Sequence, residues 1–497
     1  MNGGVLNWTV RPGIPPDAVV VVPGIMGSTL TFGNEVLWGG HRLGWYRKAW
    51  TSEEDNPLAM LSLSEDEQER ALAKCDPAQP LTQTELDGFF GGIHASGLLR
   101  KPAWAPFLRG LEPYGELVKA ISNVVVHRDA ICEFAYDWRL PVAYNARRLE
   151  HRIRSHLATW RDHPEYHRFR EELPDKRPAK VVVVAHSMGG LLARSLPDGL
   201  DIRATVTLGT PFDGAAMAPL VLHTGRRTPI PLPPERLRTM ASTLPGIHDL
   251  LPTYRCLDDV THDAYPTRLT PEFVEAIGGS RELAQASFDW QERTNARSLP
   301  GHHAVVGINQ PTASTLTYKN GVLTGHPYTF EITKTGLARD KNGFLDRQLR
   351  GGDGTVPRNS AEPRPSGVRP TAFAQQHGPL ASMKESTDLI CDVLLQRDPD
   401  APRLSAGGQG DSGIGLDVPD ITLVGEPVAF VLAGVSGAAG TTVSVHDELG
   451  RQLQNPVASK ADGVVHFKWT PSSSGIYQVV ASRGGMDVKQ RFLATQA

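Results

Sequence analysis

Two runs of valine mark the most strongly apolar segments of the chain. One run follows Asp17, reads AVVVV and ends at Pro23 and Gly24; the other follows Lys180 and reads VVVV. A strand that is apolar on both faces is typical of a parallel sheet that helices cover on both sides. The two runs therefore predict two buried strands of an α/β domain.

Helical and extended patterns alternate around these runs, which favours a doubly wound, mostly parallel sheet. The segments expected after the first run are, in chain order, a helix at 114–122, a strand at 131–136, a helix at 144–156, strands at 204–208 and 303–308, and a helix at 380–395. Two stretches rich in proline, 37–110 and 217–300, interrupt the alternation. We expect irregular cap or lid insertions there.

The character of the chain changes past Arg397. Residues 401–415 are rich in glycine and serine and are typical of a linker that separates a domain over 1–400 from one over 416–497. Short strands separated by turn residues, without a helical pattern, predict a small all-β immunoglobulin-like sandwich. The strands expected in it are 428–432, 442–446, 464–469, 476–481 and 488–493.

Charge and composition exclude several classes of function. The 51 Lys and Arg residues and 54 Asp and Glu residues give a net charge of -3, so the basic surface of a nucleic-acid binder is not expected. No apolar run reaches the roughly 18–20 residues that span a bilayer, and the first residues do not resemble a signal peptide. We therefore expect a cytoplasmic protein that touches membranes only peripherally. The four cysteines form no CxxC pair, so neither a metal site nor a redox pair is expected.

Ser187 is the strongest candidate for chemistry. It lies in AHSMGG, between the second valine run and a helical pattern. A serine becomes a nucleophile where a strained strand-to-helix turn presents its hydroxyl to a histidine, and small neighbours allow that turn. Ala185 stands where the motif commonly has glycine, and its small side chain still fits.

An acid and a base follow Ser187 in the chain order that this type of sheet requires. Asp353 lies in the turn GDGTVP, and His377 lies 24 residues further on in QQHGPL. Alone, an Asp-Gly turn is also an ordinary hairpin signal, but the order and context favour a Ser-Asp-His triad. The backbone amides of Met188 and Ile25 are the candidate oxyanion donors, with a plain tight turn as the alternative for the loop around Ile25.

Together these segments resemble the lecithin:cholesterol acyltransferase and lysosomal phospholipase A2 family of α/β-hydrolases. The matching pieces are, in order, VVVVPGIMGS, YDWR, AHSMGG, LGTP, GDGTV and His377. The resemblance implies Ser187 as nucleophile, with Asp353 and His377 as its triad partners. It also implies Ile25 and Met188 as oxyanion donors. This machinery needs no metal or organic cofactor. The Asp and Arg of YDWR are expected to satisfy each other structurally.

The resemblance implies a serine esterase of the lipase, phospholipase or O-acyltransferase kind, which acts on lipid esters, chiefly phospholipids, at a membrane surface through an acyl-enzyme. Whether water or an alcohol accepts the acyl group stays open. Two departures from the family are evident: Cys75 has no nearby cysteine for the lid disulfide, and no signal peptide is seen. The alternatives are a gated, membrane-damaging phospholipase effector and a non-catalytic interaction scaffold built on the sandwich. The sandwich is a candidate surface for a protein partner or for self-association.

Two further groups of residues have weaker signals. The aromatic residues of the insertions suit either a lipid-contacting surface or ordinary packing; they are Trp45, Tyr46, Trp50, Trp104 and Phe107. His163 and His167 have ligand-like spacing, but the segment HPEYH contains a proline and offers no evident third ligand. We expect surface histidines there.

Overall fold

The computed structural model describes most of the chain. The described residues are 14–39, 56–100, 114–173, 176–224, 234–259, 265–333, 336–363, 367–397, 413–435, 437–453, 455–461 and 464–496. The five aromatic residues singled out in the first insertion lie outside them; they are Trp45, Tyr46, Trp50, Trp104 and Phe107. Among the described residues, no helix combines the length and apolar character that crossing a bilayer requires.

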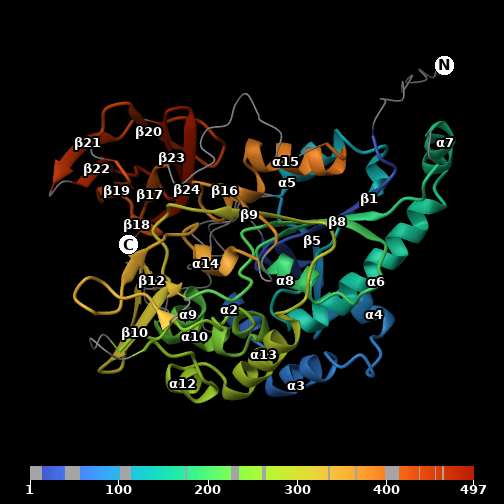
Figure 1. Ribbon diagram of the computed structural model, residues 1–497, viewed down its shortest axis with the longest axis horizontal. Helices are drawn as coiled ribbons and strands as arrows, with labels where there is room; N and C mark the ends of the chain where they lie inside the picture. Colours follow the sequence, from blue (N-terminus) through green and yellow to red (C-terminus); the bar gives the residue numbers. More distant parts are fainter. Residues whose placement is uncertain are drawn as a thin grey trace.

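A six-stranded sheet forms the centre of the first domain (Figure 1). Its strand order is β16-β9-β8-β7-β1-β6, and every neighbouring pair is parallel. The strands are β1 (Ala18–Val22), β6 (Ile131–Glu133), β7 (Val181–His186), β8 (Ile202–Leu208), β9 (His302–Gly307) and β16 (Thr371–Phe373). All residues of β1 and β7 are buried, as their valine runs predict. The predicted α/β fold class is confirmed.

Strand β6 is shorter than the 131–136 that the apolar pattern predicts, because the chain leaves the sheet after Glu133. The amide of Tyr136 donates to the hydroxyl of Ser28 at 3.0 Å, and its own hydroxyl donates to the carbonyl of Pro23 at 3.0 Å. The aromatic residues of this segment therefore support the loop after β1 instead of extending the sheet.

Helices cover both faces of the central sheet. α5 (Gly115–Ser122) packs with α15 (Lys384–Leu394) on one face, and α6 (Val142–Arg161) packs with α8 (Met188–Arg194) on the other (Figure 1). α7 (Pro164–Glu172) follows α6, and the short 3-10 turns η1 (Arg128–Ala130) and η2 (Pro379–Ala381) precede β6 and α15.

The described parts of the two insertions form regular helices and strands, where the sequence pattern predicts irregular chain. Between β1 and α5 the described residues form an antiparallel sheet of order β3-β2-β5-β4 and three short helices. The elements are β2 (Ser28–Phe32), β3 (Glu35–Trp38), α2 (Pro57–Leu61), α3 (Glu65–Ala73), α4 (Gln83–Leu86), β4 (Phe89–Phe90) and β5 (Ile93–Leu98). The described part of the second insertion is mainly helical, with α9 (Met217–Thr224), α10 (Pro234–Ser242), α11 (Pro245–His248), α12 (Pro271–Ala276) and α13 (Arg281–Thr294).

The prolines explain why the sequence pattern is misleading. Pro57, Pro245 and Pro271 each stand in the first turn of a helix, α2, α11 and α12. Proline is favoured there, since its missing N–H has no partner within the helix and its fixed φ suits the first turn. These three prolines therefore mark the starts of helices.

Small hairpins, which the sequence pattern does not predict, lie between β9 and β16. They pair β10 (Thr315–Lys319) with β11 (Val322–His326), β12 (Tyr328–Phe330) with β15 (Arg347–Leu349), and β13 (Ile332–Thr333) with β14 (Gly336–Leu337). The short helix α14 (Arg358–Ala361) follows them.

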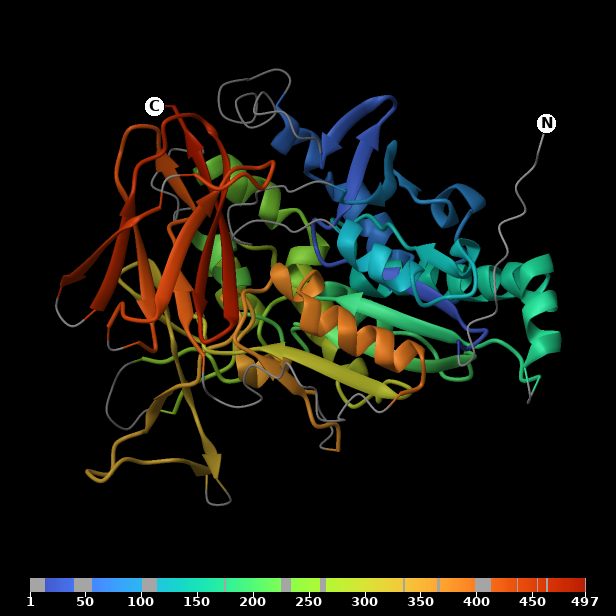
Figure 2. The same ribbon diagram turned by 90° about the horizontal axis from the view of Figure 1, so that it is seen from above.

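The C-terminal part is a β-sandwich of two four-stranded sheets, β17-β19-β22-β21 and β18-β24-β23-β20, as predicted. Its strands are β17 (Gly415–Asp417), β18 (Ile421–Leu423), β19 (Val428–Ala433), β20 (Thr441–His446), β21 (Val457–Ala461), β22 (Val464–Trp469), β23 (Gly475–Arg483) and β24 (Met486–Thr495). Phe430, Val479 and Phe492 are fully buried between the sheets. Figure 2 shows the sandwich beside the β16 edge of the central sheet. The exact domain division stays a prediction, because 398–412 lie outside the described residues.

Candidate active site

Ser187 occupies a strained turn between β7 and α8. Its φ is 53° and its ψ is -126°, a combination that L-residues rarely adopt. The turn is tight because neighbouring chain segments press on it: a Cβ added to Gly189 would lie 2.5 Å from the carbonyl oxygen of Pro23, and one added to Gly190 would lie 2.0 Å from Oγ1 of Thr210. These two positions therefore require glycine, and Ser187 is the residue of this turn that adopts the strained backbone angles.

The structure brings Ser187, His377 and Asp353 together, although the sequence separates them widely. Nε2 of His377 lies 2.8 Å from Oγ of Ser187, and Nδ1 of His377 lies 2.7 Å from Oδ2 of Asp353. All three residues are buried. The backbone amide of His377 also donates to the carbonyl oxygen of Asp353 at 2.8 Å, which ties the two loops together.

The surroundings of Asp353 determine which ring nitrogen of His377 carries the proton. Oδ1 of Asp353 accepts from the amides of Thr355 and Val356, at 3.0 and 2.7 Å. These donors stabilise a carboxylate whose other oxygen faces Nδ1 of His377. His377 therefore donates through Nδ1–H, and the lone pair on Nε2 accepts from the hydroxyl of Ser187.

The loop after β1 runs directly against Ser187. A Cβ on Gly24 would lie 2.8 Å from Cβ of Ser187, and the amide of Gly27 donates to the carbonyl of Gly24 at 3.0 Å. Ile25 lies in this turn, and Met188 is the first residue of α8. Within the described residues, no hydrogen-bond acceptor is found for the backbone amide of either.

A second buried histidine, His186, connects the loop after β1 with His377. Its Nε2 lies 3.1 Å from the carbonyl oxygen of His377, and its Nδ1 lies 2.8 Å from the hydroxyl of Tyr114. The carbonyl accepts, so Nε2 carries the hydrogen and the Tyr114 hydroxyl donates to Nδ1. The Tyr114 oxygen accepts in turn from the amide of Gly24 at 2.9 Å. Burial lowers the pKa of His186 to about 3, so its ring stays neutral.

Sequence reasoning does not find this chain of hydrogen bonds. His186 adjoins Ser187 at the end of a buried strand, which is a signal that the residue needs partners. Tyr114 lies 72 residues away in sequence, and no local pattern identifies it as that partner.

Replacing Tyr114 by phenylalanine is expected to lower the free energy of unfolding by about 1–3 kcal/mol, since it leaves Nδ1 of His186 and the amide of Gly24 buried without partners. Urea unfolding at pH 7 measures this loss. Tyr318→Phe is the control, because Tyr318 is 39% exposed and its change should alter stability by less than about 0.5 kcal/mol. Equal stabilities of the two variants would contradict the assigned hydrogen bonds.

The Asp and Arg of YDWR form a buried ion pair, as predicted. Nε and the second terminal nitrogen of Arg139 donate to the two carboxylate oxygens of Asp137, at 2.9 and 2.7 Å. Each side chain is 1% exposed. The pair neutralises itself in the core, and neither residue contacts the triad through a hydrogen bond that the structure describes.

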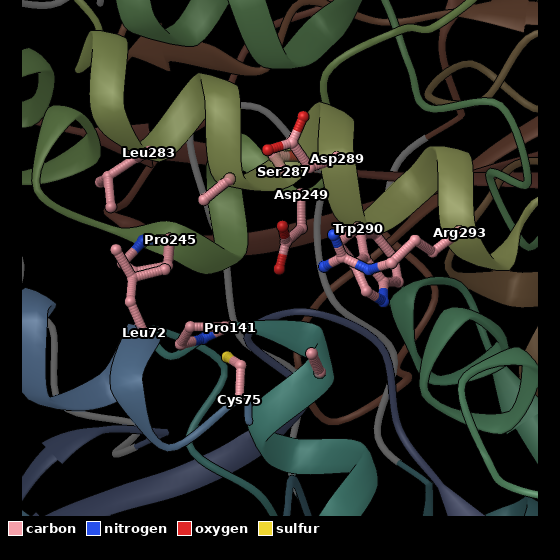
Figure 3. A pocket seen from close by; sticks show the side chains of 12 residues that line it. Leu72, Cys75, Pro141, Pro245, Asp249, Leu283, Ser287, Asp289, Trp290 and Arg293 are labelled. Atoms are coloured by element: carbon pink, nitrogen blue, oxygen red, sulfur yellow. The ribbon is translucent and has the colours of Figure 1, made fainter. Parts of the chain in front are cut away.

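A cavity of about 220 Å³ lies apart from the triad, between the first insertion, the start of α6 and the helices α11 and α13 (Figure 3). Asp249 points into it (Figure 3), and one carboxylate oxygen accepts from the amide of Val142 at 2.7 Å. Cys75 and Leu283 line opposite sides. Burial raises the pKa of Asp249 to about 7, although the Val142 amide acts in the opposite direction.

Replacing Asp249 by asparagine is expected to change how stability depends on pH. In the folded protein the carboxyl stays protonated up to about pH 7, whereas in the unfolded chain it ionises near the ordinary aspartate pKa of 3.8. Between these values the folded state binds more protons, so wild-type stability falls as pH rises. The free energy of unfolding of Asp249→Asn, relative to wild type, should therefore rise by about 2–3 kcal/mol between pH 5 and 7.5. Urea unfolding curves at both pH values measure it; a constant difference would contradict the raised pKa.

The sequence spacing pairs His163 with His167, but in the structure His163 has other neighbours. It lies beside Asp129 and His127, with Nε2 of His163 3.3 Å from Asp129 and Nδ1 of His127 3.5 Å from it. The Nδ1 atoms of the two rings accept from the backbone amides of Glu165 and Asp129, at 3.1 and 3.2 Å. Each ring therefore uses the lone pair on Nδ1 for a backbone amide and carries its hydrogen on Nε2. A metal ion bound to these rings would have to break both hydrogen bonds from the amides. The three side chains fit a hydrogen-bonded cluster better than a metal site.

Comparisons with known proteins come from sequence and from structure. Residues 106–268 match the family model of lecithin:cholesterol acyltransferase. No curated protein matches the chain significantly. Among solved structures, the crystal structure of the Tle4–Tli4 complex aligns at 15% identity and a TM-score of 0.41, covering 76% of this chain and 97% of that one. The Lin-41 filamin domain aligns at 14% identity and a TM-score of 0.15, covering 17% and 92%. The M1 domain from titin aligns at 13% identity and a TM-score of 0.13, covering 15% and 84%.

Proposed function

We propose that this chain, a lecithin:cholesterol acyltransferase-like α/β-hydrolase, cleaves acyl esters of phospholipids through Ser187. The family match confirms the resemblance that the sequence predicts, and it supports a hydrolase or acyltransferase of lipid esters. The observation that carries the finer assignment is the pair of short contacts from His377, to Ser187 at 2.8 Å and to Asp353 at 2.7 Å. This arrangement is the one that activates a serine hydroxyl.

The first half of the reaction transfers the acyl group to the enzyme. Nε2 of His377 takes the proton of Ser187 as Oγ attacks the ester carbonyl carbon, and Asp353 stabilises the imidazolium that forms. The amides of Ile25 and Met188 donate to the oxyanion of the tetrahedral intermediate. When the intermediate collapses, the ester C–O bond breaks and His377 gives the proton to the leaving alcohol, which is the lysophospholipid.

The second half releases the acyl group. His377 takes a proton from an incoming water or alcohol, whose oxygen attacks the acyl carbon, and then returns it to Oγ of Ser187 as that bond breaks. Water gives a free fatty acid, and an alcohol gives a new ester. We favour hydrolysis, because the first insertion lacks a disulfide that would hold it closed over the acyl-enzyme: Cys75 is a free thiol.

The alternatives raised by the sequence are weaker. The family match does not favour a non-catalytic scaffold or a gated effector. The hydrogen bond from Ser187 to His377 is intact, and both potential oxyanion amides are free of protein acceptors within the described residues.

Release of fatty acid from phospholipid vesicles tests the proposal. Wild-type protein is expected to release fatty acid from vesicles of phosphatidylcholine and phosphatidylethanolamine, and Ser187→Ala is expected to release none above background. Adding a long-chain alcohol then separates the two outcomes, since transfer produces a wax ester at the expense of fatty acid. If Ser187→Ala releases as much fatty acid as wild type does, the proposal is wrong.

A further inference from the structure

Four glutamines form a buried cluster where the β-sandwich meets the first domain. They are Gln310, Gln375, Gln376 and Gln490, and each is at most 3% exposed. Three come from the first domain, and Gln490 comes from β24 of the sandwich. Burying a side-chain amide costs free energy unless the amide is hydrogen-bonded. The hydrogen-bond partners of the four glutamines therefore show which segments the cluster connects.

Gln375 binds the part of β24 that β18 leaves open, because β18 pairs only with residues 493–495 of that strand. Its amide nitrogen donates to the carbonyl of Asp487 at 2.9 Å, and its amide oxygen accepts from the backbone N–H of Lys489 at 3.1 Å. The same oxygen accepts from the backbone amide of Gln376 at 3.0 Å. The side chain of Gln375 therefore pairs with the sandwich as a strand would, two residues before His377.

Gln376, directly before His377, binds the other sheet of the sandwich. Its amide nitrogen donates to the carbonyl of Leu416 in β17 at 2.7 Å and to the side-chain oxygen of Gln310 at 3.0 Å. The side-chain oxygen of Gln490 lies further from it, at 3.4 Å. Gln490 in turn exchanges two hydrogen bonds with the backbone of Val418, at 2.8 and 3.2 Å.

Gln310 links these contacts to the loop of the triad acid. Its side chain accepts from the amide of Leu416 at 3.0 Å and donates to the carbonyl of Ile414 at 3.1 Å, so it also holds the start of the sandwich. Its backbone exchanges two hydrogen bonds with Gly352, at 3.0 and 3.2 Å, directly before Asp353. One residue thus joins the sandwich to the loop that orients His377.

We propose that the β-sandwich is a positioning domain for the active site, and that Gln310, Gln375 and Gln376 are positioning residues that hold the His377 loop on it. The inference rests on the proposed function, because it assigns the sandwich a role in that reaction. The loop between β16 and η2 spans only residues 374–378, and two of its side chains are anchored on the sandwich. Without these anchors the loop is held by the backbone contacts of His377 with Asp353 and His186, which fix Nε2 less precisely at hydrogen-bonding distance from Ser187.

Two variants test the proposal from the two sides of the junction. Gln376→Leu removes the amide from the His377 loop. Lys489→Pro removes the backbone N–H of β24 that faces Gln375, and a strand tolerates proline best where its N–H does not bond a neighbouring strand. Gln291→Leu is the matched control, because Gln291 is an equally buried glutamine of α13 that binds the carbonyls of Asp249 and Leu251, away from the junction.

The measurement is the split between kcat and KM for ester hydrolysis by the full chain, well below the melting temperature of each variant. Gln376→Leu and Lys489→Pro are expected to lower kcat by about 10- to 100-fold with KM changed by less than about threefold, since a misplaced base slows chemistry without changing substrate binding. Gln291→Leu should keep kcat within about twofold of wild type.

The outcomes separate the two proposals. If wild type is active and both junction variants keep the kcat of the control, the positioning role is overturned, while the proposed function stands. If either variant fails to fold, the other one decides. An inert wild-type protein, with no ester turnover at all, overturns the proposed function and this inference with it.

Discussion

Replacing His377 by alanine is expected to lower kcat for ester cleavage by about 10⁴- to 10⁶-fold, which is the size of effect that loss of a triad base produces. The reason is geometric: in the described structure Nε2 of His377 is the hydrogen-bond partner of the Ser187 hydroxyl, at 2.8 Å. The substitution leaves the backbone contacts of residue 377 with Asp353 and His186 in place. Fatty-acid release under saturating substrate measures the effect.

The control for this variant is His151→Ala, at an exposed position of α6. It should keep the wild-type rate. A double variant that lacks both Ser187 and His377 side chains should be no slower than His377→Ala by more than about tenfold, because the two residues act as one unit. Retention of more than about one per cent of activity by His377→Ala would contradict the assigned base.

Replacing Asp353 by asparagine is expected to lower kcat by about 10⁴-fold. Oδ1 of Asp353 already accepts from the amides of Thr355 and Val356, so an asparagine would keep its oxygen on that side. Its NH₂ group would then face Nδ1 of His377. A ring that accepts through Nδ1 carries its hydrogen on Nε2, and such a ring cannot accept the proton of Ser187.

Activity and stability should separate in this variant. Asp353→Asn removes a carboxylate without changing the shape of the side chain, so its melting temperature should stay within a few degrees of wild type while kcat falls. Asp388→Asn, the same change on the exposed side of α15, is the control and should alter neither quantity. Activity of Asp353→Asn within tenfold of that control would show that another acid orients His377.

The parts of the fold that the sequence predicts well are those with local patterns. The valine runs of β1 and β7 are buried on both faces, and such strands are recognisable from five or six consecutive residues. Ser187 is recognisable for the same reason, since the strand, the small residues and the helix around it are contiguous. Strand β16 has only three residues, Thr371–Phe373, and so short a segment carries no periodicity.

The features that the sequence does not reveal depend on contacts between distant segments. Tyr114 and His186 are 72 residues apart, and Gln376 and Gln490 are 114 residues apart. A buried polar side chain of this kind needs hydrogen-bond partners, and the fold supplies them from distant segments. A single sequence does not show which segments those are. The order of Asp353 and His377 after Ser187 is informative only because the topology of a parallel sheet constrains it.

The sandwich illustrates the same limit at the level of domains. Its strands are predicted from alternation, and Phe430 and Phe492 lie in its core. Its contact with the His377 loop depends on backbone groups of Leu416, Asp487 and Lys489, which carry no side-chain signature. The sequence suggests that the sandwich is a separate binding module, whereas the structure shows it hydrogen-bonded to the loop that carries His377.

Mass spectrometry after incubation with a fluorophosphonate tests the central claim most directly, since this reagent forms a stable bond with an activated serine. Wild-type protein is expected to gain one label, on the peptide that contains Ser187, and phospholipid vesicles should slow the labelling. Ser187→Ala should gain no label. A label on any other residue, or an equal label on Ser187→Ala, would contradict the claim that Ser187 is the nucleophile of this protein.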